Sequence, residues 1–273
     1  MLFVRRYGCA GSVVIVLHGG PGAAGQMAPV ARELATSYQV IEPFQRGSSS
    51  EPLTVVRHVA DLHEVISFYT ADFRPALLGA SWGAMLTLAY AAAHPNSVGP
   101  LILVGCGTFD LTARAELQRV VAERMTDAIR ARLKDAERLD ADECLKASAE
   151  AMTPIYSYDP LISPHQEDEV DARAHQETWD DMLRLQRVGI YPAAFAAIKS
   201  PVLMVHGMFD PHPARLIAKG LQPYLPQLDY RELEHCGHYP WLEKAAAGTF
   251  YSLVRGWLEC HLEAPDTGAP VRE

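Results

Sequence analysis

The sequence lacks the features that would direct the protein to a membrane or to nucleic acid. No apolar run approaches the roughly 20 residues that cross a bilayer, and the first stretch, MLFVRRYGCAGS, has no apolar segment of signal-peptide length. Acidic residues outnumber basic residues by 33 to 24, which gives a formal net charge of -9 and no basic stripe to neutralise phosphates. We therefore expect a cytoplasmic protein with no membrane or nucleic-acid partner.

Cysteine is scarce and scattered. The chain has five cysteines, an odd number, and no CxxC pair. This spacing supports neither a disulfide framework nor a zinc site, so we expect reduced thiols and no bound metal. The five are Cys9, Cys106, Cys144, Cys236 and Cys260.

The overall composition is typical of a globular protein. The 273 residues are 49% hydrophobic and 21% charged, and no low-complexity tract interrupts them. A chain of this length can form one large domain, or a core domain with a smaller insertion. It is too short for two full domains and a linker.

Short apolar runs alternate with segments of helical periodicity in the N-terminal part of the chain. The run VVIVL ends in a tight glycine-rich loop, and apolar residues between 55 and 69 recur with the period of about 3.6 residues of an amphipathic helix. A helix between two strands favours parallel pairing, so we predict an α/β fold with a mostly parallel sheet flanked by helices. The expected strands cover 13–17, 38–41, 75–79 and 98–104, and the expected helices cover 26–36, 55–69 and 82–93.

The pattern changes between residues 109 and 195, where the sequence becomes charged, alanine-rich and helical. We expect a core domain at 1–108 and 196–262, a helical cap at 109–195, and a frayed tail at 263–273. Open α/β sheets bind ligands at the carboxyl ends of their strands, so the cap should cover that end. After the insertion, the expected strands cover 201–205 and 228–233, and the expected helices cover 213–222 and 241–260.

The stretch GASWG matches G-x-S-x-G, the pattern of a nucleophile elbow. In that elbow a serine lies on a sharp turn between a strand and a helix, and its neighbours must be small. An apolar strand pattern precedes Ser81 and a helical pattern follows it. We predict that Ser81 is a catalytic nucleophile; the simpler alternative is a Gly-Ser turn at the start of a helix.

A second glycine-rich motif, HGGPG at 18–22, follows the first strong strand. Glycine N–H groups can approach a substrate closely, as an oxyanion hole requires. The alternatives are a plain Gly-Pro turn and a phosphate-binding loop. A dinucleotide site would need G-x-G-x-x-G, and this glycine spacing differs, so we expect no nucleotide. We expect His18 to be structural.

A serine hydroxyl needs a base, and the base needs a carboxylate to orient it. His238 lies between the last expected strand and the final helix, where the base falls in the chain order serine, acid, histidine. The other candidate bases are His206, His212 and His235, of which His235 is the main rival. Asp210 follows an expected strand and is the preferred acid, with Asp229 as the alternative. Cys236 lies beside His235 but has no elbow, so we expect no cysteine nucleophile.

With an elbow, a glycine loop, an acid and a histidine in this order, the chain resembles the α/β-hydrolase superfamily over nearly its whole length. The motifs HGGPG, QRGS and GASWG resemble the proline iminopeptidase branch in particular. The resemblance implies an eight-stranded, mostly parallel sheet with a helical cap, and a triad of Ser81, Asp210 and His238. It also implies an oxyanion hole formed by the backbone N–H groups of Gly20 and Trp82.

The sequence departs from this branch just before QRGS, where Phe44 stands in place of an aspartate. True iminopeptidases hold the free amine of the substrate with glutamates from the cap, and AHQETWD resembles a Trp-acid element of that cap. Glu177, Asp180 and Asp181 are therefore candidate amine ligands. The alternative is a solvated, charged helix face. We also place Gly19, Trp179 and Tyr239 in the predicted substrate site.

These residues predict a cofactor-free serine hydrolase that cleaves an ester or an N-terminal amide bond of a small molecule or short peptide through an acyl-enzyme. The resemblance implies an activity like that of proline iminopeptidase or another aminopeptidase. A small-molecule carboxylesterase is the alternative, because both activities share this machinery and differ in the cap. An acid that reads an amine favours the peptidase, and an apolar cap favours the esterase. A lyase and a ligand-binding receptor remain alternatives, because the fold supports both.

Overall fold

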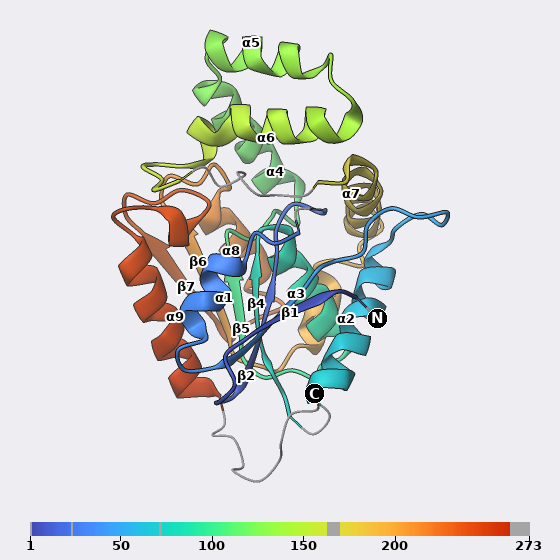
Figure 1. Ribbon diagram of the computed structural model, residues 1–273, viewed down its shortest axis with the longest axis vertical. Coiled ribbons are helices and arrows are strands. Elements are labelled where there is room, and N and C mark those ends of the chain that lie inside the picture. The colour runs from blue at the N-terminus through green and yellow to red at the C-terminus, as the bar shows by residue number, and fades with distance from the viewer. Residues whose placement is uncertain (1, 23, 71–72, 163–169, 263–273) are drawn as a thin grey trace.

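The computed structural model describes residues 2–262 except 23, 71–72 and 163–169, and the expected tail at 263–273 lies outside them. Its strands are β1 (Val4–Tyr7), β2 (Val13–Leu17), β3 (Gln39–Pro43), β4 (Ala76–Ala80), β5 (Leu101–Val104), β6 (Val202–Gly207) and β7 (Leu228–Leu233). They form one central sheet in the order β1-β3-β2-β4-β5-β6-β7 (Figure 1). β1 pairs antiparallel with β3, and every other neighbouring pair is parallel. The predicted α/β fold with a mostly parallel sheet is therefore confirmed.

Among the residues that the structure describes, the sheet has seven strands, one fewer than the family resemblance implied. Within the described residues, only β1 precedes β2, and Gly8 and Gly11 turn the chain between them with φ angles of 70° and 88°. This stretch therefore forms one edge strand and not a hairpin of two. β1 was not among the expected strands, because its sequence VRRY contains two exposed arginines and no apolar run.

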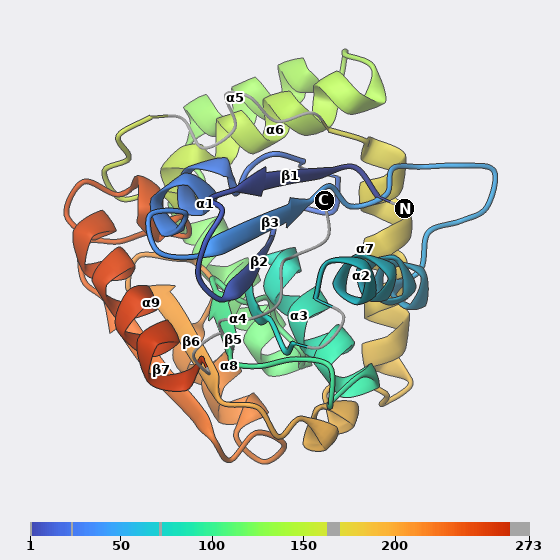
Figure 2. The same cartoon turned by 60° about the horizontal axis from the view of Figure 1, so that its bottom comes forward.

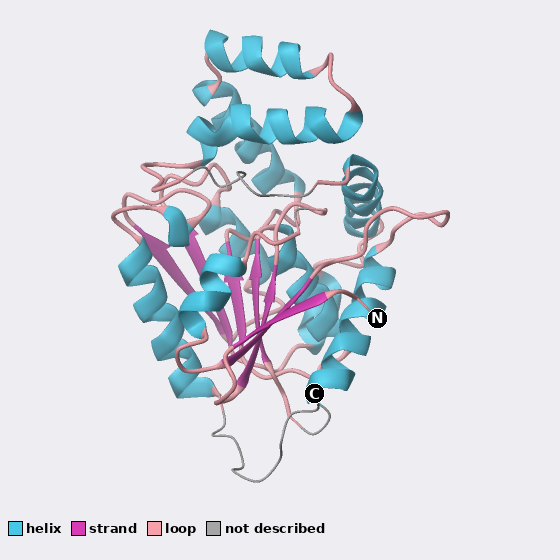
Figure 3. Cartoon of the chain, viewed as in Figure 1, coloured by secondary structure: helices cyan, strands magenta, loops and turns pink. Residues whose placement is uncertain are grey.

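Helices cover both faces of the sheet (Figure 3). Because side chains alternate along a strand, Val14 and Val16 of β2 face one helical layer, whereas Ile15 and Leu17 face the other. All four are fully buried, as expected of a central parallel strand. The first layer contains α1 (Ala28–Leu34) and α9 (Ala247–His261), and the second contains α2 (Val55–Thr70), α3 (Trp82–Ala93) and α8 (Ala214–Leu221).

In the described part of the chain, four α-helices are inserted between β5 and β6, namely α4 (Leu111–Arg124), α5 (Asp127–Ala136), α6 (Ala141–Tyr156) and α7 (Ala172–Arg187). α5 and α6 form the outermost layer of the molecule in Figure 1, whereas α7 lies beside α2, as Figure 2 also shows. Each of the four begins at a side chain that accepts a backbone N–H group of the first turn. These caps are Asp110, Thr126, Asp140 and Asp171.

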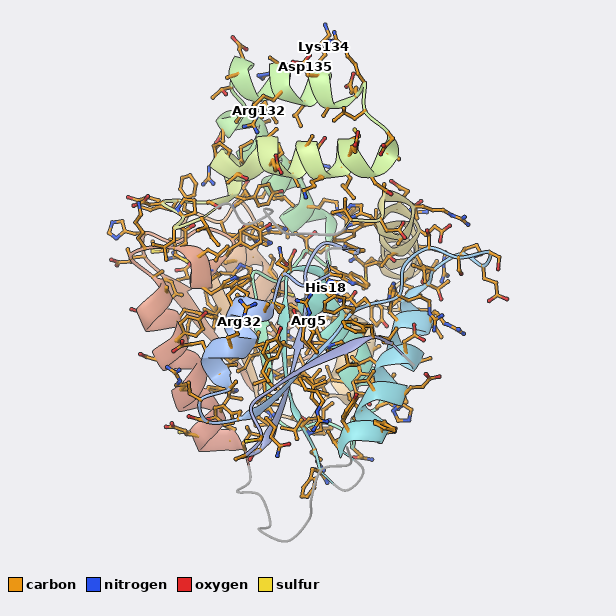
Figure 4. The ribbon with its side chains drawn as sticks, in the orientation of Figure 1. Arg5, His18, Arg32, Arg132, Lys134 and Asp135 are labelled. Carbon is orange, nitrogen blue, oxygen red and sulfur yellow. The ribbon has the colours of Figure 1, made fainter. Side chains whose placement is uncertain are left out.

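The outer face of the inserted helices is polar. Lys134 and Asp135 of α5 point away from the sheet in Figure 4. Across the part of the chain that the structure describes, no helix combines the length and the apolar character needed to span a bilayer. The cytoplasmic location stays a prediction.

Candidate active site

Ser81 occupies the turn between β4 and α3, where the sequence predicted an elbow. Its backbone has φ 53° and ψ -116°, a left-handed conformation that a residue with a side chain adopts only under strain. The Ser81 N–H group donates to the Val104 carbonyl at the end of β5, at 2.8 Å. The serine is therefore held at the carboxyl ends of two central strands.

Gly79, two residues before Ser81, has no room for a side chain. A Cβ atom on Gly79 would overlap the Gly83 carbonyl oxygen, because the elbow brings the end of β4 against the first turn of α3. This close approach explains why the motif places small residues at both positions.

Asp210 and His238 come together from the loops that follow β6 and β7. His238 Nδ1 donates to Asp210 Oδ2 at 2.7 Å, and both side chains are buried. Burial alone would raise the pKa of Asp210, but the charges and hydrogen bonds of His238 and His212 outweigh it and hold that pKa well below its usual range. The His238 ring lies against Gly105, where a Cβ atom would stand 2.9 Å from Nδ1. Gly105 follows Val104, so the pair reaches the strand end that holds Ser81.

The rival acid and base lie apart from this pair. His235 is exposed, and its ring packs beside Tyr158 with 5.3 Å between the ring centroids. The Asp229 carboxylate on β7 pairs with Arg231 at 2.9 Å. Cys236 is buried, and burial raises the pKa of its thiol, which keeps it protonated and a poor nucleophile.

The HGGPG loop lies directly against the elbow. A Cβ atom on Gly19 would stand 3.0 Å from the Ser81 Cβ atom, and the Gly19 N–H group donates to Gln26 Oε1 at 3.1 Å. Gly20 follows with a positive φ of 33°. Trp82 is the first residue of α3, where backbone N–H groups have no partner within the helix. The assignment of the Gly20 and Trp82 N–H groups to an oxyanion hole stays a prediction.

His18 and Gln45 join the three sequence motifs into one network. His18 Nε2 accepts the Gln45 N–H group at 3.1 Å, and the Gln45 side-chain amide donates to the His18 carbonyl oxygen at 3.0 Å. Gln45 Oε1 in turn accepts the Trp82 indole N–H at 2.6 Å. His18 lies near the middle of the molecule, below the inserted helices, in Figure 4. The glutamine of QRGS thus ties the glycine loop to the residue that follows the nucleophile.

The sequence offered His212 as a candidate base but did not predict that it would bond to Asp210. Its Nδ1 lies 2.9 Å from Asp210 Oδ1, so Asp210 contacts two imidazoles. Asp210, His212 and His238 also offer possible metal-ligand atoms that all lie within 4.8 Å of one another. The nitrogen–oxygen separations of 2.7 and 2.9 Å are those of hydrogen bonds, and we describe the three as a hydrogen-bonded cluster.

The segment after α6 holds the loop that carries His238. The His238 N–H group donates to the Tyr156 carbonyl oxygen at 2.7 Å. Glu243 is buried and accepts three backbone N–H groups, from Tyr158 at 2.8 Å, Asp159 at 2.7 Å and Gly237 at 3.0 Å. The sequence did not predict this role, because the Tyr158 and Asp159 partners lie 85 and 84 residues away along the chain.

The acids of α7 are engaged with the segment that leads into α2. Glu177 accepts the Leu53 N–H group at 2.8 Å, and Asp181 accepts the Val55 N–H group at 2.8 Å. Asp180 is exposed and accepts the Gln176 side-chain amide. Two of these carboxylates therefore serve the N-terminus of α2, where the helix dipole favours negative charge.

Two aromatic residues of the predicted substrate site do contact the candidate machinery. Trp179 of α7 packs edge-on against Trp82, with 6.1 Å between ring centroids. Tyr239 packs edge-on against His238 at 4.9 Å. The structure thus brings Gly19, Trp179 and Tyr239 to the site and leaves Glu177 and Asp180 bonded elsewhere.

An apolar pocket adjoins the histidine pair through Tyr156. It has a volume of about 430 Å³ and lies between α4, the start of α5 and the end of α6. Tyr156 is one of its lining residues, and the Tyr156 ring packs edge-on against His238, with 5.6 Å between centroids. The lining residues are Leu117, Gln118, Val121, Ala122, Met125, Arg130 and Tyr156.

The sequence profile described as "Alpha/beta hydrolase family" matches residues 14–249. The chain belongs to the alpha/beta hydrolase family. This alpha/beta hydrolase is 26% identical to a proline iminopeptidase of Lactobacillus helveticus (strain DPC 4571), and the alignment covers 92% of this chain and 90% of that protein. It is 27% identical to a 2-hydroxymuconate semialdehyde hydrolase of Pseudomonas sp. (strain CF600), over 91% and 87% of the two chains.

Solved structures share the fold of this chain. This alpha/beta hydrolase resembles a thermophilic esterase from Thermogutta terrifontis with a TM-score of 0.65 and 20% sequence identity. The similarity covers 95% of this chain and 93% of that one. At this level of identity the likeness shows a shared fold.

Proposed function

We propose that this alpha/beta hydrolase is a serine hydrolase in which Ser81 is the nucleophile, His238 the base and Asp210 the triad acid. The observation that carries the proposal is the buried hydrogen bond of 2.7 Å between His238 and Asp210, at the strand ends that hold Ser81 in a strained turn. An imidazole oriented by a carboxylate beside a serine on an elbow is the arrangement that makes a hydroxyl nucleophilic.

The proposed reaction passes through an acyl-enzyme. Because His238 Nδ1 is bonded to Asp210, Nε2 is the nitrogen that takes the Ser81 hydroxyl proton. The serine oxygen then attacks the substrate carbonyl, and the N–H groups of Gly20 and Trp82 stabilise the oxyanion. Each such donor contributes on the order of 10²- to 10³-fold to the rate. His238 passes the proton to the leaving group, and a water that it activates releases the acyl group.

The cap favours a substrate with an apolar group over one with a free amine. The Glu177 and Asp181 carboxylates that would bind an amine already accept backbone N–H groups. The pocket that Tyr156 lines is mainly apolar, and the Tyr156 ring packs against His238. A short-chain carboxylic ester is therefore the first candidate substrate. An N-terminal prolyl amide is the second, favoured by HGGPG and by the relative named proline iminopeptidase.

A substrate panel tests this function. Short p-nitrophenyl esters and the arylamides of proline and alanine would be offered to the wild type and to Asp210→Asn. We expect the wild type to turn over at least one class of substrate, and esters faster than arylamides. Asp210→Asn should lose about 10⁴-fold in kcat, because the neutral amide that replaces the carboxylate holds the wrong histidine tautomer. If folded wild type hydrolyses none of them, a lyase or a ligand-binding receptor replaces the proposal.

A further inference from the structure

The triad acid has an imidazole on each of its two oxygens. Asp210 Oδ2 accepts from His238 Nδ1 at 2.7 Å, and Oδ1 accepts from His212 Nδ1 at 2.9 Å. An ionised carboxylate only accepts hydrogen bonds, so each of these ring nitrogens carries its proton. The His212 side chain is 12% exposed and therefore mostly removed from water. The proposed mechanism uses only His238 and leaves the second imidazole unexplained.

The local sequence Asp210-Pro211-His212 folds the second histidine back over the acid. The His212 backbone N–H group also donates to Oδ1, at 3.0 Å, which closes the turn that aspartate forms with the residue two positions ahead. The His212 ring then stacks on the His238 ring with 4.7 Å between centroids and 19° between planes. Tyr156 packs against both rings, at 5.9 and 5.6 Å.

We propose that His212 is a positioning residue for the triad, an inference that rests on the proposed function. Its two hydrogen bonds fix the rotation of the Asp210 carboxylate, so that Oδ2 stays directed at His238. Its stacked ring fixes the plane of the His238 ring. His212 therefore acts on the reaction through Asp210 and His238. A displacement of either side chain lowers kcat without weakening substrate binding.

Two substitutions separate the hydrogen-bond donor from the stacked ring. His212→Asn keeps a neutral N–H donor near the position of Nδ1, whereas His212→Ala removes donor and ring together. In ester hydrolysis we expect His212→Ala to lose about 10- to 100-fold in kcat with little change in KM. His212→Asn should recover most of that loss, because its amide N–H can donate to Asp210. His235→Asn, at an exposed histidine near the same loop, is the matched control and should leave kcat and KM unchanged.

Nuclear magnetic resonance of the imidazole N–H protons supplies a readout that does not depend on activity. In protein labelled with ¹⁵N-histidine, we expect two strongly downfield N–H protons from the bonds to Asp210, of which His212→Asn removes one. If the wild type hydrolyses no substrate, the proposed function fails, whereas the two resonances still test the cluster.

Three results would overturn the inference. The first is a single downfield resonance that His212→Asn leaves in place. The second is a His212→Ala variant with the kcat of the wild type. The third is a loss in His212→Asn as complete as that in His238→Ala, since His212 would then be the base itself.

Discussion

Gly83, the second residue of α3, packs so closely on the chain after β2 that a Cβ atom on it would stand 2.7 Å from the His18 carbonyl oxygen. Backbone lies on both sides of this contact, so neither partner can turn away. We predict that Gly83→Ala lowers the free energy of unfolding by at least about 2 kcal/mol. Because the contact joins the elbow to the HGGPG loop, kcat should fall as well. Urea unfolding and ester hydrolysis measure the two effects.

Gly256 provides the matched control for this substitution. It also lies in a helix, α9, but no atom stands within 4 Å of the position its Cβ would occupy. Gly256→Ala should therefore stabilise the protein by about 0.5 to 1 kcal/mol through helix propensity. Equal stability of the Gly83→Ala protein and the wild type would show that the elbow tolerates a methyl group.

His206 makes stability depend on pH. The ring is fully buried and accepts the Cys106 N–H group through Nε2 at 3.0 Å, and burial lowers the pKa of His206 to about 4 despite the nearby Asp210. In the unfolded chain a histidine binds its proton near pH 6.5, so between about pH 6.5 and 4 the unfolded state binds more protons and stability falls as pH falls.

The substitution His206→Gln removes this titration and keeps an acceptor. We expect the wild type to lose about 2 to 3 kcal/mol more than His206→Gln between pH 7 and 4. Urea unfolding at both pH values measures the difference, with His235→Asn expected to follow the wild type. If the wild type and His206→Gln lose the same free energy of unfolding between pH 7 and 4, the buried, neutral state of His206 is contradicted.

The buried carboxylate of Glu243 holds the loop that carries His238. Glu243→Gln sets an amide N–H against one of three backbone N–H donors, which leaves a buried donor unpaired at a cost of about 1 to 3 kcal/mol. Because Gly237 is one of the partners, kcat should fall with stability. Thermal unfolding and ester hydrolysis test this against Glu259→Gln, an exposed acid of α9. A Glu243→Gln protein with unchanged melting temperature and kcat would refute the role.

Substitution of Glu177 tests whether the acids of α7 have a structural role or recognise the substrate. Its carboxylate accepts the Leu53 N–H group, so we predict that Glu177→Gln changes the KM for a prolyl arylamide by no more than about twofold. The KM for a p-nitrophenyl ester is the internal reference. An increase of about tenfold or more for the arylamide alone would mean that Glu177 binds the substrate amine.

Local patterns were sufficient for much of the fold. The strand-turn-helix setting of Ser81 and the loops after β6 and β7 follow from apolar runs and glycines that are close in sequence, and the structure brings Asp210 and His238 together as expected. α9 begins at Ala247 and not at 241, because Pro240–Leu242 form a short 3-10 turn. The ends of helices depend on tertiary packing, which the periodicity of apolar residues does not report.

The roles that sequence reasoning missed depend on contacts between distant segments. Glu177 resembles a solvated helix residue until Leu53, 124 residues away, supplies its N–H group. The role of Glu243 rests on three backbone N–H donors. Backbone donors leave no pattern of residue types in the sequence, because every residue except proline has one. His212 had a local indication, since Asp-Pro-His is a turn that can direct its third side chain back to the acid. Its stacking on His238 needed the fold.

The measurement that tests the central claim most directly is the reaction of the folded protein with a fluorophosphonate, followed by intact mass and peptide mapping. We predict a single adduct on Ser81, absent in a Ser81→Ala variant that keeps the wild-type melting temperature and loses at least about 10⁴-fold in ester hydrolysis. Folded wild type that forms no adduct, or Ser81→Ala that hydrolyses esters at the wild-type rate, would contradict the assignment of Ser81 as an activated nucleophile.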